Sequence, residues 1–121
     1  DLPLLEEVSR WLGTPYRYGG TTRTGADCSG FAGAVYKNVY HKSLQRTVVN
    51  IYNKDCQRIG KRRLKPGDLV FFSTYESGVS HSGLYLGDGY FISATSSCGV
   101  AVATMKNGYW HDRYVGAKRV L

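Results

Sequence analysis

The hydrophobic pattern of this chain changes once, close to Gly67. Before this residue the apolar side chains recur with helical spacing, and after it they gather in short β-rich runs. The predicted strands cover residues 68–73, 81–86, 90–95, 100–105 and 114–120. Helices that precede a set of antiparallel strands favour an α+β domain in which the sheet packs against the helices. With 121 residues, we expect a single domain spanning residues 1–121.

The first half of the chain predicts two helices and a weaker third. The first covers residues 3–13, and Pro3 suits its first turn. One face of this helix would hold the apolar residues Leu4, Leu5, Val8, Trp11 and Leu12. The second helix begins at Cys28, after an ordered loop over residues 14–27 that contains three glycines. A weaker helix candidate covers residues 47–56.

Two glycines lie inside the second predicted helix, at Gly30 and Gly33. Each glycine costs a helix about 1 kcal/mol relative to alanine. This cost is easier to understand if another part of the chain packs closely against the helix.

Cys28 is the strongest candidate for a reactive residue. It stands at the predicted helix start, in the run Asp27-Cys28-Ser29-Gly30-Phe31. The positive end of a helix lowers the pKa of a thiol, and the thiolate is the nucleophilic form. His81 opens a predicted strand and offers an imidazole that could take the thiol proton. The alternative is that Cys28 is a small buried apolar residue.

The other cysteines predict neither a metal site nor a definite disulfide. Cys56 and Cys98 could pair in an oxidising compartment and leave Cys28 free, but their spacing does not establish that they are close. Zinc is disfavoured, because no two cysteines have Cys-x-x-Cys spacing and the histidines are scattered. We expect His41 and His111 to be surface residues, and we expect neither a metal nor an organic cofactor.

The formal net charge of +7 suits an anionic partner. Nucleic acid, a membrane surface and a charged cell-wall polymer all fit this charge. The densest basic cluster, residues 61–65, is predicted to be a solvated turn, and no nucleic-acid module accompanies it. No apolar run is long enough for a membrane span. No signal peptide is present, but the chain begins with Asp1, so a trimmed product is equally consistent.

The turn at residues 87–89 decides what lies opposite His81. A two-residue Asp-Gly loop is the commoner hairpin, and it would put Ser93 on the face away from His81. A three-residue loop would place Thr95 opposite His81 and Ser93 diagonally across, opposite Gly83. The shorter loop is slightly favoured by its sequence, whereas a catalytic role for His81 needs the longer register.

The chain resembles the NlpC family of papain-like bacterial cell-wall cysteine peptidases, and in particular its murein endopeptidase lipoproteins. The resemblance covers nearly the whole chain. The matching motifs are Pro15-Tyr16-Arg17-Tyr18-Gly19-Gly20, Asp27-Cys28-Ser29-Gly30-Phe31, Leu64-Lys65-Pro66-Gly67-Asp68-Leu69-Val70-Phe71-Phe72, His81-Ser82-Gly83-Leu84-Tyr85-Leu86-Gly87, and, towards the C-terminus, Tyr109-Trp110 with Arg113-Tyr114 and Ala117 to Leu121. The implied fold is a papain-like α+β domain, with the catalytic cysteine at a helix start packed on a C-terminal antiparallel sheet.

The resemblance implies Cys28 as the nucleophile and His81 as the general base. Tyr16 would lie beside the thiolate and support the substrate or the oxyanion. Asp27 and Ser29 would contact the substrate, although either could instead cap the helix.

The third polar position of the family, usually His and sometimes Asn or Gln, falls on Ser93. A serine hydroxyl at a diagonal position reaches an imidazole only marginally. Thr95, which we also expect close to the substrate, or a bridging water could orient His81 instead.

The implied function is hydrolysis of amide bonds in peptidoglycan stem peptides or cross-links, without a cofactor. Such a protein would act as a monomer in the bacterial periplasm, at the outer membrane through a lipid anchor outside this chain, or at the cell surface after secretion. Two alternatives are a peptidoglycan-binding domain that has lost activity through Ser93, and an antibacterial toxin with the same chemistry. A nucleic-acid partner is not expected.

Overall fold

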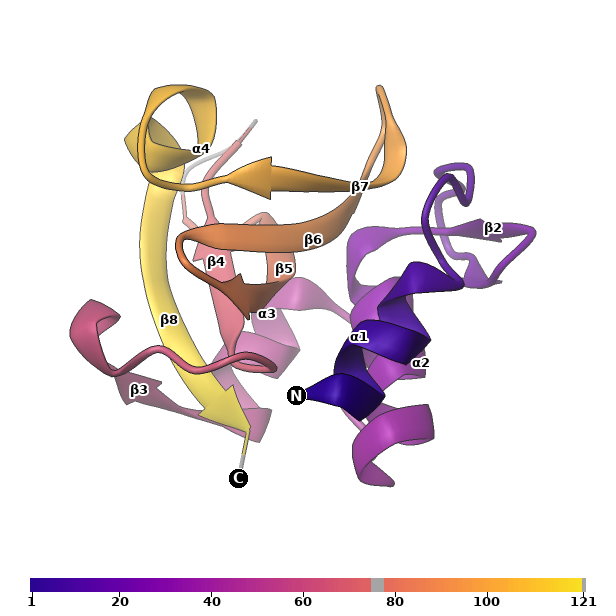
Figure 1. The fold of residues 1–121 in the computed structure, drawn as a ribbon, viewed down its shortest axis with the longest axis horizontal. Helices are drawn as coiled ribbons and strands as arrows, with labels where there is room; N and C mark the ends of the chain where they lie inside the picture. Colours follow the sequence, from indigo (N-terminus) through magenta and orange to yellow (C-terminus); the bar gives the residue numbers. More distant parts are fainter. Residues whose placement is uncertain (75–77, 121) are drawn as a thin grey trace.

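The strands of this protein form a six-stranded antiparallel sheet with the order β3-β8-β4-β5-β6-β7 (Figure 1). A computed structural model describes residues 1–74 and 78–120, with the backbone alone for Cys56. The strands are β3 (Cys56–Ile59), β4 (Leu69–Phe72), β5 (His81–Gly87), β6 (Tyr90–Thr95), β7 (Gly99–Thr104) and β8 (Tyr114–Val120). The five predicted strands are confirmed within one or two residues, and β3 is an addition.

Helices α1 (Leu2–Ser9) and α2 (Cys28–Tyr40) precede the sheet, as predicted. The predicted start of α2 at Cys28 is confirmed, but α1 ends four residues earlier than predicted. The backbone N–H groups of Arg10 and Trp11 donate to carbonyls three residues back, so the chain tightens into turns there. Of the apolar residues predicted on one face, Leu5 and Leu12 are exposed.

Shorter elements fill the connections, and most of them were not predicted. The loop before α2 holds a small hairpin, β1 (Thr21–Thr22) with β2 (Gly25–Ala26). The predicted third helix is confirmed within one residue at each end, as α3 (Val48–Asn50) continued by a π-helical turn, η1 (Ile51–Asp55). It ends there because Cys56 pairs with β8. A 3₁₀ turn, η2 (Lys61–Arg63), precedes β4, and α4 (Gly108–Arg113) precedes β8.

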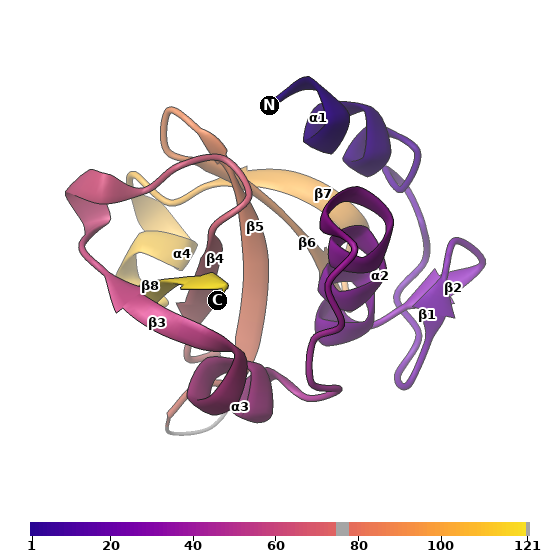
Figure 2. The same ribbon diagram turned by 90° about the horizontal axis from the view of Figure 1, so that it is seen from below.

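The sheet has an apolar core on each side. On one side α2 packs on the sheet and α1 packs on α2, in a core that includes Phe71, Leu84 and Ile92. On the other side α4 supplies Trp110 against Phe72 and Phe91. Figure 2 shows α1 and α2 together on one side of the strands, with α4 on the other. Because neighbours along a strand point to opposite faces, consecutive residues of β5 serve different cores.

The β5–β6 hairpin combines features of both predicted registers. The loop is the two-residue Asp88-Gly89 turn, with φ of 53° and 80°, and Gly87 pairs with Tyr90. The register then shifts between Tyr85 and Gly87, so that Leu84 pairs with Ile92. A bulge of this kind adds one residue to a strand. The shorter loop is therefore correct, and the bulge restores the register that places Ser93 on the face of His81.

The N-terminal turn of α2 lies against the preceding loop. A Cβ atom added to Gly30 would lie 2.1 Å from the Gly20 carbonyl oxygen, so only glycine fits at this position. The predicted close contact is therefore confirmed for Gly30. It is wrong for Gly33, where no atom lies within 4 Å of an added Cβ.

The predicted surface features lie outside the core. His41, His111 and the basic turn η2 are exposed. Cys98 is a free, exposed thiol in the β6–β7 turn, whereas the side chain of Cys56 lies outside the described part of the chain. The disulfide considered above involves this undescribed side chain, and the structure records Cys98 as a free thiol. Among the described residues, no helix has the length and apolar character needed to span a membrane.

Candidate active site

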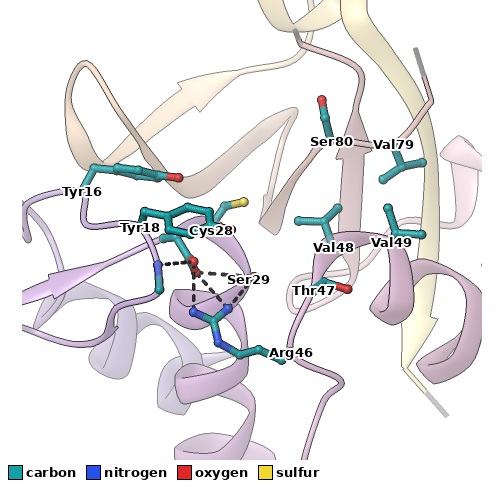
Figure 3. A pocket seen from close by; sticks show the side chains of 12 residues that line it. Tyr16, Tyr18, Cys28, Ser29, Arg46, Thr47, Val48, Val49, Val79 and Ser80 are labelled. Atoms are coloured by element: carbon teal, nitrogen blue, oxygen red, sulfur yellow. Dashed lines mark hydrogen bonds and ion pairs between the residues drawn. The ribbon is translucent and has the colours of Figure 1, made fainter. Parts of the chain in front are cut away.

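Cys28 lies at the first position of α2, between two cavities. One cavity, of about 380 Å³, extends towards Arg46 and Val48, and the other, of about 350 Å³, extends towards His81 and Trp110. Tyr16, Cys28 and Ser80 line both. Figure 3 shows the side chains of Tyr16 and Cys28 pointing into the first cavity. A ligand that crosses both cavities would therefore pass over the sulfur.

Burial dominates the ionisation of Cys28. Its side chain is buried, and this burial, together with the negative charge of Asp27, raises the pKa of the thiol. The backbone N–H groups of Ser82 and Ser29 face the sulfur and oppose this effect without outweighing it. The prediction of a lowered pKa at the helix start is therefore wrong for the unliganded protein, in which the thiol is protonated at neutral pH.

His81 is buried among aromatic rings at the start of β5. Its imidazole stacks on the Trp110 indole, with ring centroids 4.8 Å apart and an interplanar angle of 29°. Burial lowers its pKa to about 4, and its Nε2 atom has no hydrogen-bond partner among the described residues. The imidazole is therefore neutral at physiological pH.

Neither residue expected to orient His81 hydrogen-bonds its Nε2. Ser93 is buried on the same face of the sheet, but Nε2 accepts or donates no hydrogen bond among the described side chains. The Thr95 hydroxyl instead serves the β6–β7 turn, accepting from the Cys98 N–H at 3.1 Å and donating to the Gly99 carbonyl at 3.4 Å. The ring contacts of His81 are with Trp110 and, at 6.2 Å, with Phe72.

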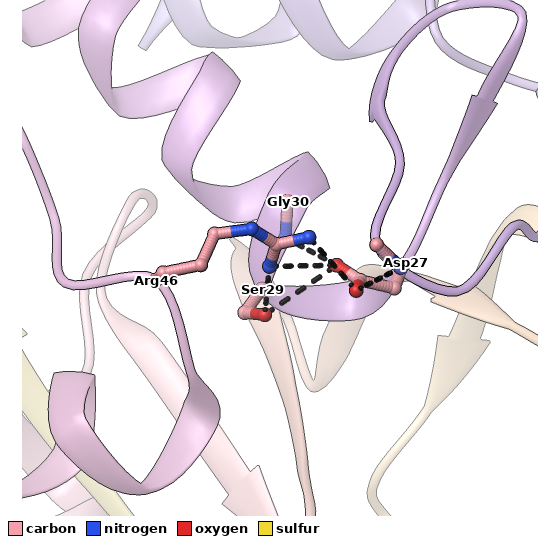
Figure 4. A network of polar contacts seen from close by, with 5 residues as sticks. Asp27, Ser29, Gly30 and Arg46 are labelled. Carbon is pink, nitrogen blue, oxygen red and sulfur yellow. Dashed lines mark hydrogen bonds and ion pairs between the residues drawn. The ribbon is translucent and has the colours of Figure 1, made fainter.

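Asp27 is held by a network that the sequence did not reveal (Figure 4). The Arg46 guanidinium donates to both carboxylate oxygens, at 3.1 and 3.0 Å, and to the Ser29 hydroxyl at 2.8 Å. The carboxylate also accepts the N–H of Gly30 at 2.7 Å, which caps α2, and the N–H of Gly19 at 2.9 Å. The predicted capping role of Asp27 is confirmed.

This network keeps Asp27 ionised despite its burial. Burial alone would raise the pKa of Asp27, but the hydrogen bonds from Arg46, Gly30 and Gly19 outweigh it and lower the pKa. Arg46 belongs to the segment between α2 and α3, and no spacing rule links it to Asp27. The sequence signal that could have pointed to this contact is Asp27 itself, because a buried carboxylate requires a positively charged partner.

Replacing Arg46 with methionine is expected to lower the free energy of unfolding by about 2 kcal/mol, because a mostly buried carboxylate would lose its charged partner. Urea unfolding at pH 7 would measure this loss. Arg10→Met is the control, because Glu7 is as buried as Asp27 but keeps the hydrogen bonds from Trp11 and Asn38. The loss of the more exposed Arg10 is therefore expected to cost less than about 0.5 kcal/mol. Equal losses in the two variants would contradict a special role for Arg46.

Among the described residues, no group of three or more His, Cys, Asp or Glu side chains is arranged to hold a metal ion. The Cys28 thiol and the His81 imidazole line one cavity beside the first turn of α2, so the arrangement offers a nucleophile and a base.

Comparison with known sequences identifies the family of this domain. A model of the NlpC/P60 family matches residues 13–119. The chain belongs to the NlpC/P60 family. The resemblance noted from the motifs is thereby confirmed.

Relatives within the NlpC/P60 family include cell-wall endopeptidases. The chain is 43% identical over 116 residues to the probable peptidoglycan endopeptidase LytE of Bacillus subtilis, covering 96% of this chain and 33% of LytE. It is 34% identical over 118 residues to the murein DD-endopeptidase and murein LD-carboxypeptidase MepS of Escherichia coli, covering 98% of this chain and 62% of MepS. The chain thus spans less than two thirds of either relative.

The fold of NlpC/P60 proteins matches this structure. A crystal structure from Staphylococcus aureus, of a protein similar to a lipoprotein of the NLP/P60 family, superposes with a TM-score of 0.86 at 34% identity. The superposition covers 98% of this chain and 40% of that chain. The expectation of a papain-like α+β fold is confirmed.

Proposed function

We propose that this domain hydrolyses amide bonds in the peptide part of peptidoglycan, with Cys28 as the nucleophile and His81 as the general base. The observation that carries the proposal is the cavity of about 350 Å³ that both side chains line. The names of LytE and MepS, both endopeptidases of this polymer, support the choice of substrate. The cross-link between stem peptides is the bond that we favour.

Because Cys28 and His81 are both neutral before substrate binds, the first step includes a proton transfer between them. As the Cys28 sulfur attacks the carbonyl carbon, its proton passes to His81, so that both charges form only with substrate in place. The oxyanion is stabilised by N–H groups at the start of α2 and by the Tyr16 hydroxyl. When the C–N bond breaks, the imidazolium gives its proton to the departing amine. His81 then takes a proton from water, and the water oxygen attacks the thioester carbonyl. The C–S bond breaks, and the imidazolium gives the proton to the departing thiolate.

Stacking on Trp110 takes the place of a third polar residue in this proposal. The indole fixes the plane of the imidazole and favours its cationic form through its π face. Ser93 then contributes little, because it makes no hydrogen bond to Nε2 of His81. Trp110 is thus a positioning residue that acts through His81.

Replacing Trp110 with alanine is expected to lower kcat roughly 10- to 100-fold with little change in KM, because the imidazole loses its fixed orientation. Trp110→Phe should retain most of the activity, since a phenyl ring still stacks. Cleavage of a defined muropeptide, well below the melting temperature of each variant, would measure both constants. A loss of the same size in both variants, or an effect confined to KM, would contradict the positioning role.

The two cavities divide the substrate on either side of the sulfur. The cavity with Arg46 also has Tyr18 and Ser29 in its wall, and we assign to it the recognition of a polar part of the stem peptide. Asp27 also lines it, but its carboxylate is engaged by Arg46 and two N–H groups, so it shapes this cavity. Thr95 lines the cavity on the His81 side.

The setting of this activity is the wall itself. The net charge of +7 favours a polymer that carries carboxylates and associated phosphates. We place the domain, as a monomer and as a single unit over residues 1–121, in the bacterial periplasm, at the outer membrane or at the cell surface. A toxin acting on the wall of another cell would use the same chemistry.

Digestion of purified peptidoglycan, with the released fragments identified by mass, tests this function. Cleaved cross-links are expected, and protein previously alkylated at Cys28 should release none. A folded protein that sediments with the wall but releases no fragment would overturn the proposed activity. It would support the second candidate, a peptidoglycan-binding domain. One observation favours this candidate: Nε2 of His81 has no hydrogen-bond partner within residues 1–74 and 78–120.

A further inference from the structure

Ser82 follows His81 on β5 and has an unusual environment. It is fully buried, with 0% of its surface exposed, and its hydroxyl has no hydrogen-bond partner among the described residues. An unpaired polar group in a protein interior destabilises the folded state, and most buried hydroxyls find a partner. The resting structure therefore does not explain why a hydroxyl is present at this position, whereas a partner that forms in another state of the site would explain it.

The strand register shows which way Ser82 points. Ser82 pairs with Phe71, and His81 pairs with Phe72. Phe71 belongs to the core beneath α1 and α2, whereas Phe72 belongs to the core on the other side of the sheet. Ser82 therefore points towards α2, where Cys28 is the first residue. Both its backbone N–H and its hydroxyl act on the Cys28 sulfur, although the hydroxyl does not form a regular hydrogen bond to the neutral thiol.

We propose that the Ser82 hydroxyl donates a hydrogen bond to the Cys28 sulfur when the thiol loses its proton. A thiol is a weak acceptor and a thiolate is a strong one, so the hydroxyl gains its partner only in the ionised state. An interaction made only in the reacting state accelerates a reaction without stabilising the resting enzyme. The inference rests on the proposed function for its use in catalysis, but not for the contact itself.

The charges around the Cys28 sulfur do not favour a thiolate, so a hydrogen-bond donor such as Ser82 would stabilise it. Asp27 opposes a negative charge on the sulfur, and the Arg46 cation is already bound to Asp27. His81 is neutral, so it adds no positive charge beside the sulfur. Tyr16 lines the cavity that Cys28 and His81 share. The donors that act on the sulfur include the N–H groups of Ser82 and Ser29 and the Ser82 hydroxyl.

The test is the pH dependence of Cys28 alkylation by iodoacetamide, with the modified residue identified by peptide mass. In Ser82→Ala the midpoint should move to higher pH, and alkylation below the midpoint should slow by about tenfold. Ser82→Thr keeps the hydroxyl and should keep the midpoint of the unmodified protein. The melting temperature of Ser82→Ala should be unchanged or higher, because the substitution removes an unpaired hydroxyl.

An unchanged midpoint in Ser82→Ala would overturn the proposal. A lower melting temperature with an unchanged midpoint would show that the serine is structural. If Ser82→Ala does not fold, a shifted midpoint in Ser82→Thr would count against the proposal, because its hydroxyl is retained. Alkylation does not require substrate, so a shifted midpoint in a protein that cleaves no peptidoglycan would reject the proposed function and keep this inference.

Discussion

Replacing Cys28 with alanine is expected to reduce peptidoglycan cleavage by roughly 10⁴-fold or more. In enzymes of this type, loss of the nucleophile removes the covalent route and leaves only binding and oxyanion stabilisation. The neighbouring hydroxyls of Ser29, Ser80 and Ser82 do not replace it, because an alcohol ionises far less readily than a thiol. Muropeptides released per hour, separated by chromatography and identified by mass, would measure the loss.

Cys98→Ala is the matched control for Cys28→Ala. Cys98 is also a free thiol, but it is exposed in the β6–β7 turn, and its substitution should leave the rate unchanged. The Cys28→Ala variant should still fold and sediment with peptidoglycan, because it retains both cavities. If it cleaves at a rate close to that of the unmodified protein, the nucleophilic role of Cys28 is refuted. If both variants lose activity together, the assay reports a general sensitivity to cysteine substitution.

Replacing His81 with alanine is expected to lower the rate roughly 10³-fold, which lies within the usual range for loss of a general base. The pH profile should identify the group. Because burial lowers the pKa of His81 from 6.5 to about 4, the imidazole remains an available base down to about pH 4. The acid limb of the rate profile should therefore lie near pH 4 and not near 6.5. Initial rates on a soluble muropeptide between pH 3.5 and 8 would locate it.

His81 should also make the free energy of unfolding depend on pH, in a direction that follows from its lowered pKa. Its pKa is lower in the folded than in the unfolded protein, so the unfolded state binds more protons below pH 6.5. The stability that His81 supports is present above this pH and declines as the pH falls towards about 4. His81→Ala should remove this decline, whereas the exposed His111→Ala should not. An acid limb near pH 6.5, or an undiminished decline between pH 6.5 and about 5 in His81→Ala, would contradict the buried, neutral imidazole. Below about pH 5 the protonation of Asp27 and Glu7 lowers the stability of both proteins.

Local sequence signals predicted the features that depend on neighbouring residues. Asp27 caps α2 and sets its start at Cys28, as expected for an aspartate at an N-cap. The Asp88-Gly89 dipeptide forms the expected two-residue turn, because both residues tolerate a positive φ. Short runs rich in β-branched and aromatic residues predicted five strands, because such residues favour an extended backbone. The short strand β3 was missed because an edge strand carries a weak pattern of this kind.

Features that depend on distant residues were decided by the tertiary structure. The bulge near Leu86 depends on packing across two strands, and it alone brings Ser93 to the face of His81. Trp110 reaches His81 from a short helix whose sequence has no apolar period. Arg46 reaches Asp27 across 19 residues, which no local pattern specifies.

Cys28 and His81 show the same division between what the sequence determines and what the tertiary structure determines. The sequence by itself determined the fold class, the family and the positions of the thiol and the imidazole, because these depend on residue type, spacing and local conformational preference. It predicted a lowered pKa for Cys28 from the helix start, whereas the folded protein raises it. The ionisation of Cys28 and His81 was decided by the tertiary structure alone, because desolvation depends on which segments pack over a side chain.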